Sequence, residues 1–138
     1  MRAEEFNELT KNIIDAFYYV YNHLGFGFLE NVYQNALFLE LKKRGFKVET
    51  EKRIDVNYEG MVVGKYKADM LVNDKIILEL KATQFLLSEH EMQLMNYLKA
   101  TDIEIGLLLN FGKKAQIKRK IYNNEYKKCK VQKPCSSV

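Results

Sequence analysis

Two short segments of the chain carry acidic and basic side chains at spacings that suit phosphate chemistry. In residues 65–72 and 75–82 the even positions are apolar, and most of the odd positions are charged. Such alternation is typical of strands that bury one face. The even-numbered residues of both strands must face the same core. In an antiparallel pair, the residue numbers of opposite residues add up to a constant, and this constant must be even if even-numbered residues are to lie opposite one another. A three-residue loop, 73–75, meets this condition and pairs Val72 with Ile76, whereas a two-residue turn does not.

This register gathers two carboxylates and one ammonium group. Asp69 falls directly opposite Glu79, with side chains about 5 Å apart, and Lys81 follows Glu79 on the same face. Two carboxylates about 4 Å apart repel by about 4 kcal/mol at an effective dielectric constant of about 20, so they need a proton, a cation or a metal to coexist ionised. Oxygen ligands without histidine or thiolate suit Mg²⁺ or Mn²⁺. The residues alone equally allow a structural ion triplet on a sheet face.

The surrounding elements predict a mixed α/β domain. Apolar residues at three- and four-residue steps predict helices, and alternating or fully apolar runs predict strands. Helices are expected at about 3–24, 28–44 and 88–100, and extended segments at 46–51, 54–58, 61–72, 75–82 and 103–111. Residues 117–122 fit an edge strand or a short last helix. The expected order is α-α-β-β-β-α-β, with a central mixed sheet flanked by helices.

Length and composition limit the class of protein. The chain has 138 residues, 47% of them hydrophobic, which suits one domain, expected over 1–122. From residue 113 onward there are nine lysines and arginines and one acid, so 123–138 is expected to be a basic, flexible tail. Such a tail either contacts a polyanion or only aids solubility. With no membrane-length apolar run and no secretory signal, we expect a cytoplasmic protein without a membrane partner.

Several motifs, in their order along the chain, resemble those of one protein superfamily. Asp69, nine intervening residues and Glu79-Leu80-Lys81 resemble the D…(D/E)-x-K core of the PD-(D/E)XK nucleases. Residues 27–33, Gly-Phe-Leu-Glu-Asn-Val-Tyr, are similar to the signature of the GxxExxY family within that superfamily. The resemblance covers about residues 5–120 and includes the segments 40–41, 64–69, 93–98 and 106–112.

The resemblance implies a restriction-endonuclease-like fold and a metal site that uses Mg²⁺ or Mn²⁺. Asp69 and Glu79 match the metal-binding acids of the superfamily, and Lys81 matches its catalytic lysine. The backbone carbonyl of Leu80 often completes the metal shell. Glu30 matches an acid of the first helices that supports the metal or its waters and is counted here among the catalytic residues.

The resemblance also implies a substrate. Gln93 and Tyr97, which share one helix face, resemble a Q-x-x-x-Y motif and are expected to contact substrate phosphate. The implied function is a deoxyribonuclease-like phosphodiesterase, which hydrolyses DNA with a metal-activated water held by Asp69 and Glu79 beside Lys81. The alternative is a non-catalytic nucleic-acid-binding or accessory module on the same fold. A homodimer stays open, because nucleases of this fold often pair to cut two strands.

Overall fold

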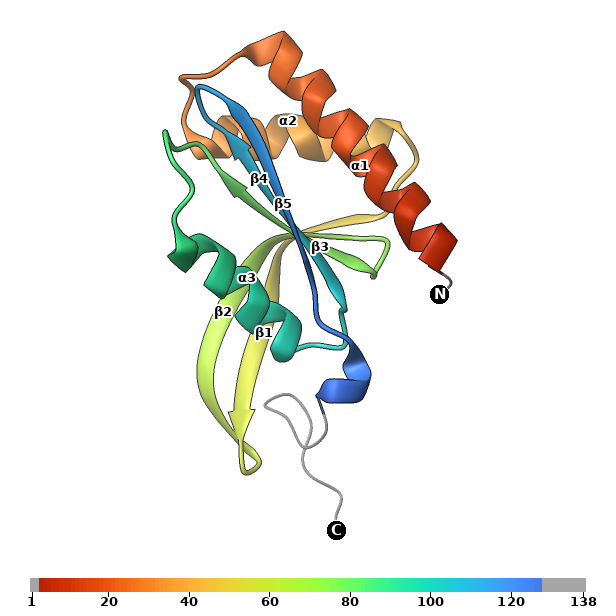
Figure 1. Cartoon of the computed structure of the whole chain (residues 1–138), viewed down its shortest axis with the longest axis vertical. Helices are drawn as coiled ribbons and strands as arrows, with labels where there is room; N and C mark the ends of the chain where they lie inside the picture. Colours follow the sequence, from red (N-terminus) through yellow and green to blue (C-terminus); the bar gives the residue numbers. More distant parts are fainter. Residues whose placement is uncertain (1–2, 128–138) are drawn as a thin grey trace.

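The computed structural model describes residues 3–127 as three layers, with α1 and α2 on one face of a sheet and α3 on the other (Figure 1). The elements are α1 Ala3–Leu24, α2 Glu30–Lys43, β1 Val48–Tyr58, β2 Met61–Val72, β3 Ile76–Lys81, α3 Ser88–Lys99, β4 Ile105–Phe111, β5 Ala115–Ile121 and a 3₁₀ turn, Asn124–Tyr126. The predicted mixed architecture and element order are confirmed. The two extended segments expected within 46–58 form one strand, and residues 117–122 take the edge-strand alternative as part of β5.

The sheet is mixed because one of its connections is a crossover. Its strands lie in the order β1-β2-β3-β4-β5, and β3 and β4 are the parallel pair, joined through α3. All other neighbours pair antiparallel. The predicted register between β2 and β3 is confirmed, since Val72 pairs with Ile76 and Met70 with Leu78. Asn73 and Asp74 adopt positive φ angles of 52° and 59° in the loop between these strands.

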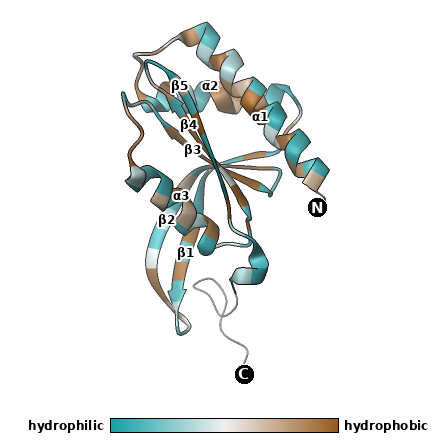
Figure 2. Ribbon diagram, in the orientation of Figure 1, coloured by the Kyte–Doolittle hydropathy of each residue, from teal (hydrophilic) through white to brown (hydrophobic). Residues whose placement is uncertain are grey.

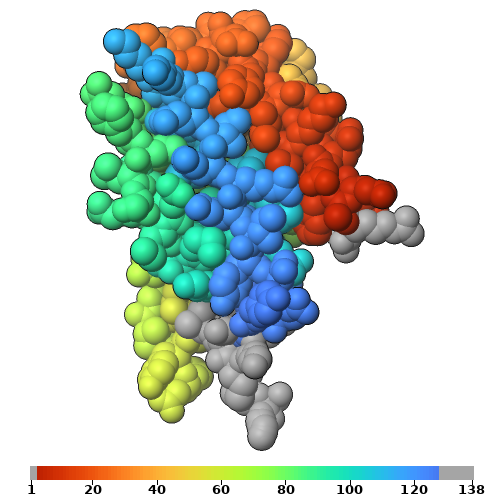
Figure 3. Space-filling model, viewed as in Figure 1, coloured from red at the N-terminus to blue at the C-terminus, as the bar shows by residue number. Residues whose placement is uncertain are grey.

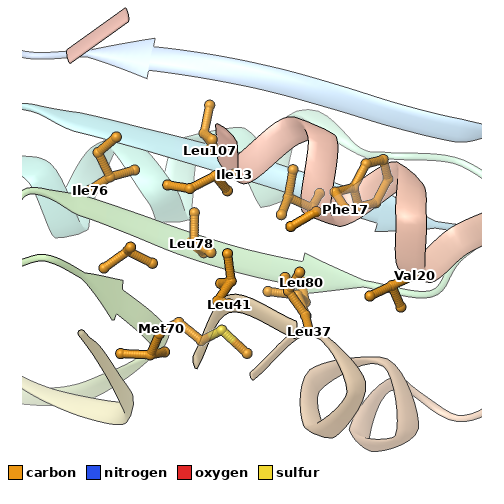
Figure 4. Close-up of a cluster of buried hydrophobic side chains, with 14 of the residues drawn as sticks. Ile13, Phe17, Val20, Leu37, Leu41, Met70, Ile76, Leu78, Leu80 and Leu107 are labelled. Carbon is orange, nitrogen blue, oxygen red and sulfur yellow. The ribbon is translucent and has the colours of Figure 1, made fainter. Parts of the chain in front are cut away.

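Two hydrophobic clusters fill the spaces between the layers. The larger one joins α1 and α2 to the sheet, and Figure 4 shows Phe17 and Leu37 directed toward Leu78 and Leu80. The smaller cluster joins Leu94 and other residues of α3 to the opposite face. The helices carry both hydrophilic and hydrophobic bands (Figure 2), which is typical of helices with one buried face.

The β1–β2 hairpin changes faces along its length. Near the sheet centre, Met70 belongs to the larger cluster, whereas Ala68 and Ile54, further along the hairpin, belong to the smaller one. The change occurs where the ladder skips Glu51, which has a φ of 49° and lies opposite Asp69. The prediction that even positions share one face therefore holds from Met70 through β3 and is wrong for Ala68. The change coincides with the positive φ of Glu51, while the register shift between β1 and β2 lies further out, between Val56 and Asn57.

The predicted tail, 123–138, enters the described structure only with its first residues. Lys127 is buried at the end of the sheet, where its Nζ donates hydrogen bonds of 2.8 Å to the carbonyls of Thr101 and Ile103. Residues 128–138, and both cysteines with them, lie outside the described part of the chain. Between residues 3 and 127, no helix has the length and apolar character needed to cross a membrane.

Candidate active site

Asp69 and Glu79 interlock where β2 and β3 separate. The regular pairing of these strands ends at Met70 and Leu78. One residue further, the amide of Asp69 donates to Glu79 Oε1 at 3.0 Å, and the amide of Leu80 donates to Asp69 Oδ2 at 2.7 Å. Side-chain oxygens thus replace the carbonyls that would continue the ladder. The structure brings together the two acids that the register predicted to be neighbours.

Burial and mutual repulsion act on these acids in the same direction. Glu79 is only 4% exposed. Its burial, followed by the charge of Asp69, raises the pKa of Glu79 to about 8. Burial also raises the pKa values of Asp69 and Glu30. Lys81 opposes the shift at all three acids. Lys81 therefore offsets only in part the cost of ionising these acids in the buried site.

Glu30 reaches this site because a buried tyrosine shapes the segment before it. Glu30 is the first residue of α2, and the chain enters the helix through Gly27, whose φ of 112° favours glycine. The Tyr33 hydroxyl donates to the Gly25 carbonyl at 2.6 Å and accepts from the Phe28 amide at 3.2 Å. Since Tyr33 is fully buried, its role is to anchor this turn. Glu30 is close enough for the charges of Lys81 and Asp69 to influence its pKa.

Gln93 and Tyr97 approach the acids from the opposite layer. They lie one turn apart on α3, and the Gln93 amide donates to the Tyr97 hydroxyl. Tyr97 in turn donates to the Lys67 carbonyl on β2 at 3.4 Å. Burial raises the pKa of Tyr97, and the charges of Glu79 and Asp69 raise it further. Tyr97 thus carries a neutral hydroxyl beside the acids.

Asn110 positions the chain that follows Lys81, a role that sequence reasoning missed. It is fully buried on β4 and pairs with Lys81 in the parallel register. Its Oδ1 accepts from the Thr83 amide at 3.0 Å, and its Nδ2 donates to the Thr83 carbonyl at 2.9 Å. Gly112 completes this contact, since a Cβ there would lie 2.1 Å from the Thr83 oxygen. The available signal was one amide side chain within an otherwise apolar strand.

The donor set suits a divalent cation. Asp69, Glu79 and Glu30 offer carboxylate oxygens, which Mg²⁺ and Mn²⁺ prefer. The raised pKa values of all three show that burial disfavours their ionised forms, and a bound cation would stabilise those forms. Within residues 3–127, no three acidic, histidine or cysteine side chains are gathered tightly enough to hold an ion. The fit therefore rests on the interlocked pair Asp69 and Glu79, with Glu30 at its edge.

Comparisons with known proteins identify the superfamily and the fold. A family model described as the PD-(D/E)XK nuclease superfamily matches residues 7–120. The fold is similar to a solved structure described as "Crystal structure of SSO0001", with a TM-score of 0.53 and 23% sequence identity over 67% of this chain. The match spans 50% of that other chain, and at this identity it shows the fold alone. No curated protein matches.

Proposed function

Because the chain belongs to the PD-(D/E)XK nuclease superfamily, we propose that it is a metal-dependent nuclease that hydrolyses phosphodiester bonds in DNA. The observation that carries this proposal is the interlock of Asp69 with Glu79 next to Lys81. We also assign the chain to the GxxExxY family. The turn of residues 27–33 supports this assignment, since Gly27, Glu30 and Tyr33 each have a distinct structural role there.

In this proposal, Asp69 and Glu79 hold Mg²⁺ or Mn²⁺, with the Leu80 carbonyl and Glu30 as further ligands. When bound, such an ion polarises the phosphoryl group and lowers the pKa of a water molecule. The Lys81 ammonium group stabilises the negative charge that develops on the phosphate. The Asp69 and Glu79 carboxylates accept hydrogen bonds from backbone amides, and these bonds hold both side chains in place. Their orientation therefore does not depend on substrate.

Gln93 and Tyr97 contact the substrate phosphate in this scheme. The Gln93 amide has two N–H donors, of which one binds the Tyr97 hydroxyl, and Tyr97, whose raised pKa keeps its proton in place at neutral pH, would exchange its bond to the Lys67 carbonyl for one to phosphate. Their location on α3 means that phosphate would be held between two layers of the fold, with the acids on the strands and the neutral donors on the helix.

The alternative of a purely structural ion triplet is less consistent with the electrostatics. Paired acids in a structural triplet have lowered pKa values, because a close cation favours the ionised form. Here the pKa values of Asp69 and Glu79 are raised. Moreover, none of the ion pairs between residues 3 and 127 involves Lys81. Buried acids with strongly shifted pKa values cluster at functional sites.

A second candidate is a nucleic-acid-binding or accessory module without catalysis. It is favoured by one observation, namely that three potential ligands are not gathered around one point in the described chain. The two candidates differ in metal binding and turnover. The test is cleavage of linear, circular and single-stranded DNA with Mn²⁺, comparing wild type with Glu79→Gln, together with calorimetric titration of Mn²⁺. Cleavage that the substitution abolishes supports the nuclease, whereas DNA binding without metal heat or cleavage supports the module.

A further inference from the structure

A pocket opens beside the candidate site, between α3 and the outer part of the β1–β2 hairpin. Its volume is about 500 Å³, which lies within the range of about 300–1,000 Å³ that is usual for small-molecule sites. In Figure 3, α3 lies against this hairpin, whose tip projects beyond it. The hairpin contributes Val56 and Tyr66 to the lining, and α3 contributes Met92, Asn96 and Tyr97. The walls thus combine apolar surfaces with side-chain amides and, at the ends of α3, with Glu89 and Lys99.

Tyr66 forms a flat and firmly held wall of this pocket. Its ring lies over Gly64, where a Cβ would come within 3.1 Å of the Tyr66 ring and 3.6 Å of the Val56 Cβ. A second ring, that of Tyr97, lies 6.0 Å away between centroids. Tyr66 nevertheless keeps 50% of its surface exposed. The ring is therefore fixed by its neighbours and still offers a face to a ligand.

The pocket and the candidate site share a wall. Tyr97 lines the pocket, and its hydroxyl is hydrogen-bonded to the Lys67 carbonyl, two residues before Asp69 on β2. Tyr66 precedes Asp69 by three residues on the same strand, a span of about 10 Å. A ligand seated on Tyr66 would thus extend toward the acids along β2.

We propose that this pocket holds one unpaired base of a DNA strand, stacked on Tyr66, while an adjacent phosphate of that strand lies at Asp69 and Glu79. This inference rests on the proposed nuclease function and narrows its substrate class to single-stranded or unpaired DNA. A base within a duplex is already stacked on its neighbours, so it reaches such a pocket only after it leaves the helix.

The chemistry of the pocket fits a base of any identity. Aromatic side chains stack on every base, because each base has a π face, and such stacking tolerates sequence changes. Asn96 offers both a donor and an acceptor to a base edge. Lys99 of α3 also lines the pocket and offers a positive charge near the phosphate of a bound strand, whereas Lys65 and Lys67 flank Tyr66 and are directed to the opposite face of β2.

The test measures binding of fluorescent oligothymidylate and of a blunt duplex, with Ca²⁺ in place of Mg²⁺ and cleavage monitored in parallel. Tyr66→Ser is expected to weaken binding of the single strand by roughly 5- to 150-fold, the range typical of one stacked base. Tyr66→Phe keeps the ring and is expected to bind like wild type. Tyr58→Ser is the matched control, since Tyr58 is a 65% exposed tyrosine of the same hairpin outside the pocket lining.

A second arm tests the base itself. We use oligonucleotides that lack one base, with the gap placed at different positions along the strand. Binding to wild type is expected to weaken when the gap falls at the position that the pocket holds. For that oligonucleotide, Tyr66→Ser should weaken binding no further. Gly64→Ala retains the Tyr66 ring but presses on it, so an intermediate loss is expected. Melting curves of each variant establish that it is folded.

The outcomes separate this inference from the function on which it rests. If wild type cleaves DNA with Mg²⁺ and Tyr66→Ser binds and cleaves single strands equally well, the base pocket is wrong and the nuclease stands. Equal losses for single strand and duplex also overturn the pocket. If wild type neither binds nor cleaves any DNA, both proposals are wrong.

Discussion

The Asp69 amide donates to the Glu79 carboxylate, while the Asp69 carboxylate accepts from the amide that follows Glu79. This reciprocal exchange takes one oxygen of each acid and links it to the backbone of the other strand. The opening between β2 and β3 and the position of the acids are consequently one structural feature. A change at either acid alters the way the two strands separate as well as the local charge.

Glu79→Gln is expected to separate metal binding from folding. The amide oxygen can still accept from the Asp69 amide, and glutamine stays neutral in the buried site without having to bind a proton, so the metal-free variant should be at least as stable as wild type at neutral pH. Mg²⁺ at about 100 times its dissociation constant should stabilise wild type by about 2.7 kcal/mol. It should barely stabilise the variant. Thermal melting with and without Mg²⁺ measures both effects, and equal stabilisation of the two proteins would refute the assignment of Glu79 as a ligand.

Lys81→Met is expected to slow chemistry without abolishing metal binding. The methionine keeps most of the stem but removes the ammonium group, and a positioned catalytic group of this kind typically contributes about 100- to 10,000-fold in rate. Single-turnover cleavage measures the loss, and the Mg²⁺-dependent melting shift should persist. Lys75→Met, an exposed lysine in the loop before β3, is the control and should cleave at the wild-type rate. Wild-type cleavage by Lys81→Met would remove this lysine from the mechanism.

The stability of the metal-free protein is expected to fall as pH rises from about 4.5 to about 8. Glu79 has a pKa of about 8 in the folded protein against 4.5 when unperturbed. In this window the folded state binds a proton that the unfolded state has released, so the free energy of unfolding decreases with rising pH. Urea unfolding in the presence of a chelator measures the slope. Glu79→Gln should flatten it, and an identical slope in both proteins would contradict the raised pKa.

Tyr33→Phe is expected to destabilise the fold by about 0.5–1.5 kcal/mol, because the partly buried hydrogen bonds to the Gly25 carbonyl and from the Phe28 amide are lost. The ring contact with Phe111 should remain, with centroids 4.5 Å apart. In the proposed nuclease, cleavage should fall as well, since the turn that positions Glu30 loosens. Urea unfolding and cleavage assays measure the two losses. An unchanged unfolding midpoint would show that the hydroxyl does not anchor the turn.

The neighbouring positions of Asp69 and Glu79 were predictable because burial imposes a simple rule on strands. Alternating polarity fixes which face each residue takes, and a three-residue loop is compatible with that alternation. Helix and strand boundaries followed from periodicity in the same way. The family motifs then singled out Glu30, Gln93 and Tyr97, which the structure places around the acids from two different helices.

Features that depend on individual hydrogen bonds were not predictable. The N-cap residue of α3 is Leu87, whose amide donates to His90 Nδ1 at 3.1 Å, and leucine gives no sequence signal for a cap. The face change of the hairpin coincides with a positive φ at Glu51, and a glutamate gives no sequence signal for that conformation. The contact of Asn110 with Thr83 joins residues that are 27 positions apart. Periodicity carries no information about such pairs.

The separation of the hydrophobic residues into two clusters gives the molecule two units of unequal stability. The buried residues of α3 belong only to the smaller cluster, and the larger cluster includes none of them. A sub-global opening could thus release α3, and Gln93 and Tyr97 with it, while α1, α2 and the interlocked acids stay folded. Such openings require less free energy than complete unfolding. Hydrogen exchange in α3 should accordingly be faster than in β3. In the proposed nuclease, α3 would then be the element that moves when a DNA strand binds.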